Sequence, residues 1–363
     1  MCIAYIVFFL LIAVSVFNSE NTDEALRKLL LKSPLLLFPF VLSAFSRLKT
    51  ETRYLLAFIC SYALYLPAVV SVYNYFLNKE LFDDLILQSK PLPVEMGYGI
   101  YHIQFSIILA GVILLGLISL RHMYINSRVN VIFYALALMV VVNIISIHIL
   151  SARTGLIGLY AGVGMWLLSL TGHFKKGTLR WVLPLVVLIP LALYFLSSSL
   201  RNRILNTVDD FNVVMEQKDP NDYSFALRVR AWQNAANVIK QHPFTGVGLG
   251  DAEQVLYEQF ALTDPAVMPQ NRKNPHFQLM ETAVQSGLIC ALAYFFIFIL
   301  MFFRDNKSIN IHMLCFGALF FIASCFESIL ERQASVVAFV FFIGMAEGLF
   351  RKSTPDPLSQ SFV

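Results

Sequence analysis

Three residues of this sequence have a type and a neighbourhood suited to chemistry. The first, His276, follows Asn274 and Pro275 and comes directly before a long apolar run. Asn is typical of a helix N-cap and Pro of the first helical turn, so we expect His276 in the first turn of a helix. The positive end of that helix disfavours an imidazolium and attracts anions, which suits a neutral histidine acting as a general base. The alternative is an interfacial histidine that only forms hydrogen bonds.

The other two residues are arginines, whose forked side chains bind phosphate oxygens well. Arg153 begins an apolar run in HILSARTGLIGLY (148–160), where it either binds an anion or extends to the lipid headgroups. Arg228 lies within DYSFALRVRAWQNAANVIKQ (222–241), whose apolar spacing of three and four predicts an amphipathic helix ended by Pro243. The residues with this spacing are Phe225, Val229, Trp232, Ala236 and Ile239.

The stretch HPFTGVGLGD (242–251) follows this helix and carries Gly246, Gly248 and Gly250. It lacks the G-x-x-x-x-G-K-[ST] pattern of a P-loop and the G-x-G-x-x-G pattern of a dinucleotide fold, and no β-α-β pattern surrounds it. We interpret it as a structural turn, in which glycine permits positive φ and close backbone packing. Asp251 is expected to cap or close this turn.

The composition is that of an integral membrane protein. Of the 363 residues, 58% are hydrophobic and 14% are charged, with a net charge of +4. Soluble proteins carry about 25% charged residues, and the mean hydropathy here is +0.67. We expect the chain to lie in a lipid bilayer and to have no nucleic-acid partner. The five cysteines are scattered without a C-x-x-C pair, which indicates neither a disulfide framework nor a zinc site.

Ten apolar runs approach the roughly 20 residues that a helix needs to cross hydrocarbon. We predict an all-α polytopic membrane protein of about ten transmembrane helices, with one large outward-facing helical loop between the seventh and the eighth. The start of the chain has no basic region before its apolar run, so a signal peptide is the less consistent interpretation. The runs are 2–17, 34–48, 54–77, 98–120, 131–150, 154–172, 180–199, 277–303, 309–330 and 333–350.

The predicted domains and their orientation follow from these runs. Basic residues in short loops favour the cytoplasm, and with ten spans most of them lie on one side, so the long polar segment faces outward. The loop 18–33 is also basic and fits this less well. The predicted domains are N-terminal transmembrane helices (1–199), a periplasmic loop subdomain (200–276), C-terminal transmembrane helices (277–350) and a cytoplasmic tail (351–363).

Taken in order, these motifs resemble the O-antigen ligase / O-antigen polymerase family of bacterial envelope glycosyltransferases. The resemblance covers about residues 140–345, and the earlier spans are similar only in character. Each motif is weak alone, and the ordered set is more specific. The motifs are SARTG (151–155), Arg228-x-x-x-Trp232, HPFTGVGLGD (242–251), PHFQL...SGLI (275–289) and ESILERQASVVAFVFF (327–342).

The resemblance implies transfer of a glycan from undecaprenyl pyrophosphate to an acceptor hydroxyl on the periplasmic face of the inner membrane. In the ligases the acceptor is lipid A–core, and in the polymerases it is a second lipid-linked glycan. We take ligase as the first interpretation and an O-antigen or exopolysaccharide polymerase as the alternative. A lipid-glycan transporter or a non-catalytic assembly protein is the alternative from another class.

The resemblance also implies roles for single residues. His276 matches the family's base, while Arg153 and Arg228 match the arginines that hold pyrophosphate, with Arg230 as a nearby alternate. Glu327 and Glu331 are expected to orient the base, bind acceptor hydroxyls or pair with Arg332. The chain has no D-x-D motif, which suits a metal-independent reaction without a cofactor.

The chain departs from the family pattern in three ways. Members commonly have His-Asn where this chain has His276 followed by Phe277, and they often have an acidic residue where it has Gln285. The family's first membrane helices are also expected to be partly missing, since a full member would have about twelve spans.

Overall fold

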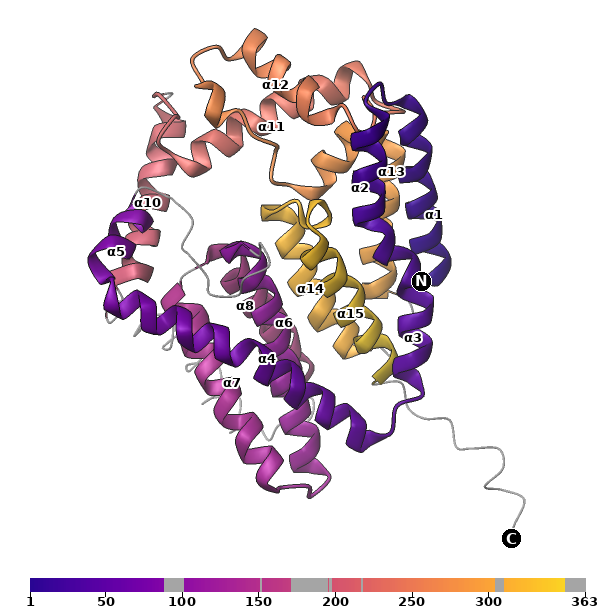
Figure 1. The fold of residues 1–363 in the computed structure, drawn as a ribbon, viewed down its shortest axis with the longest axis vertical. Helices are drawn as coiled ribbons and strands as arrows, with labels where there is room; N and C mark the ends of the chain where they lie inside the picture. Colours follow the sequence, from indigo (N-terminus) through magenta and orange to yellow (C-terminus); the bar gives the residue numbers. More distant parts are fainter. Residues whose placement is uncertain are drawn as a thin grey trace.

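The computed structural model describes residues 1–87, 101–150, 152–170, 195, 198–216, 218–303 and 310–349. Over these residues every regular element is a helix, which confirms the predicted all-α class (Figure 1). The helices up to residue 170 are α1 (Cys2–Val14), η1 (Ser15–Asn18), α2 (Thr22–Lys32), η2 (Ser33–Leu37), α3 (Phe38–Ser46), α4 (Thr50–Leu77), α5 (Lys79–Leu87), α6 (His102–Ile125), α7 (Val131–Leu150) and α8 (Arg153–Leu170). The later helices are α10 (Ser198–Met215), α11 (Ser224–Gln241), α12 (Ala252–Thr263), η3 (Pro269–Asn271), α13 (Gln278–Phe303), α14 (Ile311–Phe326), η4 (Ile329–Glu331) and α15 (Gln333–Leu349).

Five helical segments in the described part of the chain are long and apolar enough to cross a membrane. Shorter apolar helices accompany them at Cys2–Asn18, Ile311–Phe326 and Gln333–Glu347. The chain is therefore a polytopic helical membrane protein, and the finer prediction of ten spans stays a prediction. The five segments are Thr22–Ser46, Thr50–Leu77, His102–Ile125, Val131–Leu150 and Gln278–Phe303.

One part of the predicted topology differs from the structure, and two other parts lie largely outside the described residues. The segment 18–33, expected to be a loop, contains α2, which continues through η2 and α3 as one apolar segment from Thr22 to Ser46. Asn21 caps α2 by accepting the backbone N–H of Glu24. The predicted span 180–199 and the predicted tail 351–363 lie outside the described residues, apart from Phe195 and the first residues of α10.

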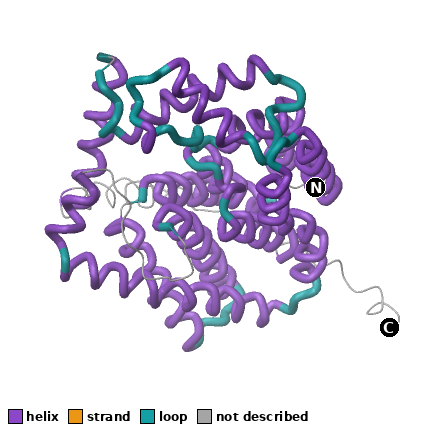
Figure 2. Tube along the Cα trace, turned by 45° about the horizontal axis from the view of Figure 1, so that its top comes forward, coloured by secondary structure: helices purple, strands orange, loops and turns teal. Residues whose placement is uncertain are grey.

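Different segments of the chain lie at the two ends of the helix bundle. At one end, the loop after α6 meets the start of α4, where Arg128 Nη1 lies 2.5 Å from Glu51 Oε1. This contact brings the loop after α6 and the start of α4 to the same end of the bundle. At the other end, α11 and α12 lie across the ends of α1, α2 and α13 (Figures 1 and 2).

Close packing of α8 against α14 brings two predicted site residues to the same end of the bundle. Gly158 and Gly162 face α14 closely enough that an added Cβ would lie 3.3 Å from the carbonyl oxygen of Leu319 and 3.0 Å from that of Cys315. Small residues spaced by four allow such a close approach of membrane helices. Because α8 begins at Arg153 and α14 ends directly before Glu327, the packing places both residues at one end.

The glycine turn after α11 closes a break in the apolar helix α13. Gly287 leaves the helical conformation with φ 83° and ψ 170°, and the turn supplies partners for the backbone groups that the break releases. The N–H of Val247 donates to Val284 O at 2.9 Å, that of Gly248 donates to Gln285 O at 3.1 Å, and that of Leu288 donates to Pro243 O at 2.8 Å. Non-helical backbone in an apolar setting requires such internal partners.

The same turn also holds the N-terminal hairpin, in which η1 and the residues after it connect α1 to α2. Asp251 accepts the backbone N–H groups of Glu20 at 2.7 Å and Asn21 at 2.9 Å, while Gly250 N–H donates to Ser19 Oγ at 3.0 Å. A Cβ on Gly248 would lie 2.6 Å from Ser19 Oγ, and one on Gly250 would overlap the carbonyl of Asn21. The predicted turn is therefore a junction of three segments, and Asp251 closes it across to the N-terminal hairpin.

Replacing Gly287 by Ala is expected to destabilise the protein. This backbone conformation is essentially restricted to glycine and costs another residue about 1–3 kcal/mol. The added Cβ would also overlap the carbonyl of Phe244. We expect the thermal unfolding midpoint of the detergent-solubilised Gly287→Ala variant to lie several degrees below that of the unsubstituted protein. The fraction that stays folded at each temperature is measured by size-exclusion chromatography. Gly164→Ala is the matched control, since a Cβ there has no atom within 4 Å. Equal midpoints for the two variants would contradict this role of Gly287.

Candidate active site

The Arg228-x-x-x-Trp232 pair lies on one face of α11 and holds the segment that precedes α13. Trp232 Nε1 donates a hydrogen bond of 2.7 Å to the carbonyl of Pro275. Its ring also packs edge-on against Phe277, with centroids 6.5 Å apart. Residues four apart on a helix share a face, so Arg228 extends beside the same segment. Trp232 thus contacts the residues on both sides of His276 and anchors this part of the chain.

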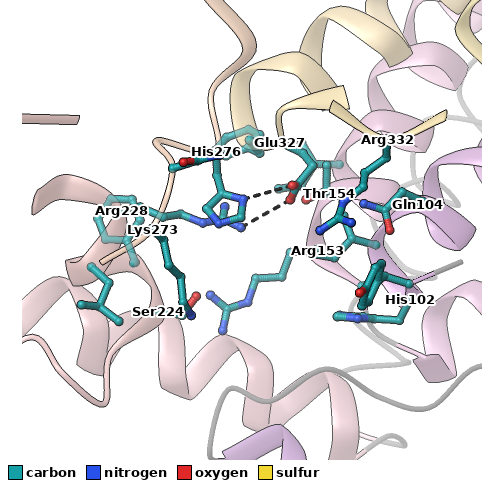
Figure 3. A pocket seen from close by; sticks show the side chains of 18 of the residues that line it. His102, Gln104, Arg153, Thr154, Ser224, Arg228, Lys273, His276, Glu327 and Arg332 are labelled. Atoms are coloured by element: carbon teal, nitrogen blue, oxygen red, sulfur yellow. Dashed lines mark hydrogen bonds and ion pairs between the residues drawn. The ribbon is translucent and has the colours of Figure 1, made fainter. Parts of the chain in front are cut away.

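His276 lies in the turn before α13, which corrects the expectation that it occupies the first turn of that helix. The helix begins at Gln278, and His276 has a left-handed backbone with φ 48°. This conformation is uncommon for non-glycine residues and tends to occur at functional sites. It turns the imidazole toward Glu327, whose Oε1 lies 3.0 Å from Nδ1 (Figure 3). A direct contact with a carboxylate, rather than the dipole of α13, therefore sets the environment of His276.

Glu327 connects the histidine to an arginine. Its Oε2 lies 3.9 Å from Arg228 Nη2, so Arg228 and His276 converge on one carboxylate, as Figure 3 shows. The Glu327 side chain is only 9% exposed. Burial opposes its ionisation, but the hydrogen bond from His276 and the charge of nearby Arg228 hold the pKa of Glu327 below its usual value. The carboxylate is therefore the acceptor, which leaves the proton of a neutral His276 on Nδ1 and frees Nε2 to accept one.

Arg153 pairs with a buried aspartate on α10. Its Nη1 lies 3.6 Å from Asp210 Oδ2, and Asp210 also accepts the backbone N–H of Phe225 at 3.2 Å. Burial raises the pKa of Asp210, partly offset by the N–H of Phe225 and by Arg153. Asp210 thereby connects α10, the start of α11 and the start of α8. Sequence reasoning missed Asp210, because only its contacts distinguish it from the neighbouring Asp209.

Arg153, Arg228, His276 and Glu327 line a cavity of about 650 Å³ at the end of the bundle that α11 covers. Arg153, Arg228, Lys273 and Arg332 all line it, and Glu327 is the carboxylate among its lining residues. Figure 3 shows Arg153 extending into the cavity below the His276–Glu327–Arg228 group. The other lining residues are Tyr101, His102, Ile103, Gln104, Ala152, Thr154, Ile157, Thr207, Ser224, Phe225, Leu227, Asn274, His276 and Phe326.

Lys273 and Arg332 are lining cations that the sequence interpretation did not assign to the site. Within the described part of the chain, neither has a carboxylate at ion-pair distance, and Arg332 instead lies 4.8 Å from the ring centroid of Tyr101. Both stand within or next to the motifs that carry the resemblance, three residues before His276 and five after Glu327. That proximity was the signal in the sequence that could have identified them.

Two of the predicted site residues lie elsewhere. Arg230 Nε lies 3.5 Å from Asp264 Oδ2, and Arg230 does not line the cavity. Glu331 contacts Lys32 at 2.8 Å rather than its neighbour Arg332. Both side chains therefore make structural ion pairs, whereas Arg153, Arg228, His276 and Glu327 come together. No group of three or more His, Cys, Asp or Glu side chains among the described residues is arranged to hold a metal ion.

Two departures from the family pattern have local partners in the structure. Phe277 fills the space beside Trp232, where its ring helps to fix the His276 turn. Gln285 donates a hydrogen bond of 2.9 Å to Glu281, one helical turn earlier on α13. A carboxylate is thus present beside position 285, although it comes from a different residue.

Comparison with known proteins agrees with the motifs. Residues 138–295 match a family model described as O-antigen ligase. The matched range includes Arg153, Arg228, the glycine turn and His276, while Glu327 and Arg332 follow it. The chain is also similar to an uncharacterised protein of Haemophilus influenzae, with 24% identity over 294 residues, which cover 80% of this chain and 69% of that protein.

Replacing Glu327 by Gln is expected to destabilise the protein most above pH 4.5, the ordinary value for a glutamate. Because the folded-state pKa of Glu327 is lowered, its carboxylate contributes stability that is present above that pH and is lost as the pH falls through the folded-state pKa. Thermal midpoints of the two proteins should therefore differ at neutral pH and converge in acid. Glu253→Gln, which removes an exposed carboxylate on α12, controls for the loss of one charge. A difference between the Glu327 variant and the unsubstituted protein that stays constant with pH would contradict this account.

Proposed function

We propose, from the premise that residues 138–295 belong to the O-antigen ligase family, that this protein is an O-antigen ligase. It would transfer a glycan from undecaprenyl pyrophosphate to a hydroxyl of lipid A–core on the periplasmic face of the inner membrane. One observation carries the proposal: His276, Glu327 and Arg228 converge beside Arg153 in a cation-rich cavity at the end of a membrane helix bundle.

In this reaction His276 acts as the general base. Its Nδ1 donates to Glu327 at 3.0 Å, which leaves Nε2 to accept the proton of the acceptor hydroxyl. The acceptor oxygen forms a bond to the anomeric carbon, and the bond from that carbon to the pyrophosphate oxygen breaks, with its electron pair leaving on pyrophosphate. Glu327 stabilises the imidazolium that results, as the buried carboxylate does in a Ser-His-Asp triad. A single displacement of this kind inverts the anomeric centre.

The leaving pyrophosphate would be stabilised by the cations of the cavity. Arginine presents paired donors that match phosphate oxygens, and fixed cations stabilise charge that develops in the transition state. Arg153 is paired with Asp210 and Arg228 with Glu327, so their charges are largely balanced. The remaining positive charge comes from Lys273 and Arg332. It matches the two negative charges of the pyrophosphate diester in the donor and also stabilises the charge that develops on the leaving oxygen, without a metal ion or other cofactor.

The apolar residues of the cavity suit the lipid part of the donor. Ile157, Leu227 and Phe326 line it beside the charged residues. A polyprenyl tail could extend from this wall along the apolar helices while its pyrophosphate meets the cations. The same cavity chemistry would serve a polymerase, whose acceptor is a second lipid-linked glycan, and the experiment below separates the two.

The proposal predicts that His276→Ala abolishes glycan transfer in cells. In a strain lacking the gene, the unsubstituted chain should restore glycan on lipid A–core, as seen on a gel of envelope polysaccharide. Loss of a general base typically lowers the rate by about 10²–10⁴-fold, which should leave no visible product. His242→Ala is the matched control, because His242 is exposed at the end of α11 and lies outside the cavity.

The other outcomes of this experiment are equally informative. Ladders of long chains in place of single repeats would identify a polymerase rather than a ligase. Equal product from the His276→Ala variant and the unsubstituted protein, at equal protein levels, would overturn the catalytic proposal and favour a transport or assembly role.

A second prediction concerns the unbalanced cations. Inorganic pyrophosphate is expected to bind the purified protein and to raise its thermal midpoint. Lys273→Met and Arg332→Met should each weaken this binding about tenfold or more, since a hydrogen bond to a charged group contributes about 1.5–3 kcal/mol. Lys240→Met removes an exposed cation of α11 outside the cavity and should leave binding unchanged. If all three variants bind alike, the cavity cations do not hold pyrophosphate.

A further inference from the structure

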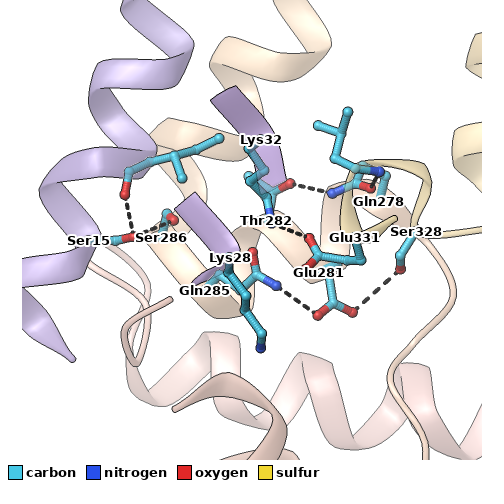
Figure 4. Close-up of polar contacts among 12 residues, drawn as sticks. Ser15, Lys28, Lys32, Gln278, Glu281, Thr282, Gln285, Ser286, Ser328 and Glu331 are labelled. Carbon is cyan, nitrogen blue, oxygen red and sulfur yellow. Dashed lines mark hydrogen bonds and ion pairs between the residues drawn. The ribbon is translucent and has the colours of Figure 1, made fainter. Parts of the chain in front are cut away.

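A buried ion pair joins the N-terminal hairpin to the segment that carries Glu327. Lys32 Nζ, at the end of α2, lies 2.8 Å from Glu331 Oε1, and the two side chains are 2% and 14% exposed. Figure 4 shows them meeting beside α13. Burial opposes ionisation of Glu331, but the adjacent Lys32 holds the pKa of that carboxyl below its usual value. The cavity does not include either residue, so the pair has no direct part in the proposed chemistry.

Glu331 is part of a short, tightly bonded segment between α14 and α15, residues 327–332. Within it, Ile329 N–H donates to Glu327 O at 3.0 Å and Glu331 N–H donates to Ser328 O at 3.1 Å. Glu327 and Arg332, the first and last residues of the segment, both line the cavity. A shift of Glu331 would therefore move both of these cavity residues, because so few bonds separate them.

The same segment is bonded to the helix that follows His276. Gln278, which is fully buried, accepts the backbone N–H of Leu330 at 2.7 Å and donates to Thr282 at 3.1 Å. Ser328 Oγ lies 3.5 Å from Glu281 Oε2 on α13. Figure 4 shows this network between α2, α13 and the 327–332 segment. These bonds fix the position of the 327–332 segment relative to α13, and thereby the position of Glu327 relative to His276.

We infer that Lys32 is a positioning residue for the proposed transfer: its ammonium holds Glu331, and through it the 327–332 segment, so that Glu327 meets His276 and Arg332 faces the cavity. This inference rests on the proposed function for its link to catalysis. Lys32 is the member of the network that belongs to the N-terminal hairpin, some 300 residues before Glu331. The hairpin thereby becomes part of the active-site scaffold.

Because the Lys32–Glu331 pair is buried, the choice of substitutions that test the positioning role of Lys32 depends on the charge that each one leaves behind. Removing one partner of a buried ion pair leaves an uncompensated buried charge, whereas replacing both partners by apolar residues is often neutral for folding. We therefore choose Lys32→Met, Lys32→Arg and the double substitution Lys32→Met with Glu331→Met. Arg27→Gln is the matched control, since Arg27 is an exposed cation of α2 that bonds to Glu24 within the helix.

Two measurements are made on the purified full chain. Hydrogen exchange detected by mass spectrometry should show faster exchange in the peptide covering 327–332 for Lys32→Met and for the double variant, with the peptides of α6 and α8 unchanged. Lys32→Arg should restore slow exchange, and Arg27→Gln should match the unsubstituted protein. In liposomes with lipid-linked donor and lipid A–core acceptor, the same two variants should lower kcat by about 10²-fold with KM for the donor unchanged, the size expected for misplaced catalytic groups.

The outcomes separate this inference from the proposed function. Unchanged exchange at 327–332, or equally faster exchange throughout the chain, would overturn positioning by Lys32. Faster local exchange with undiminished kcat would overturn its link to catalysis. If Lys32→Met fails to fold, the double variant decides, because it leaves no unpaired charge. An unsubstituted protein without transfer activity would refute the proposed function, while the exchange measurement would still decide whether Lys32 holds the segment.

Discussion

The carboxylate of Glu327 is the interaction on which the rest of this site depends. His276, from the turn before α13, and Arg228, from α11, both contact it, so that it links three segments that are far apart in the sequence. A buried carboxylate is stable only when opposite charge and hydrogen bonds replace water. Glu327 therefore requires both partners to be in place. Conversely, a nearby carboxylate sets the tautomer that makes a histidine useful as a base.

The charges at this end of the bundle are arranged in pairs with a small positive excess. Arg153 with Asp210 and Arg228 with Glu327 are close to neutral as pairs, which limits the cost of burying four charged groups beside an apolar bundle. Lys273 and Arg332 add positive charge at the cavity without a carboxylate partner among the described residues. A small excess of fixed positive charge in a cavity attracts anions.

Much of the architecture was predictable because apolar runs and helical spacing are local signals. The helix 222–241, the turn at 242–251 and the spans near α4, α6, α7 and α13 follow from such patterns. Arg153, Arg228, His276 and Glu327 were predictable as a set through the family resemblance. Lys32 and Asp210 were not, since their roles depend on contacts between segments far apart in the chain. Arg230 was misplaced because it lies two residues after Arg228, so the two side chains point about 200° apart around α11. Only the packing of α11 decides which of them faces the cavity.

The glycine turn shows how the site and the fold depend on one another. The residues proposed to do chemistry stand mostly at helix ends or just beyond them, where backbone groups have lost their helical partners. Near a membrane those groups need partners from the protein itself. The turn 242–251 provides them for the break at Gly287 and for the hairpin before α2, in one place. At each glycine of the turn, a Cβ would collide with a neighbouring segment. Without these Cβ atoms, α11, α13 and α2 can approach one another closely. Arg228, His276 and Lys32 can then all contact the 327–332 segment.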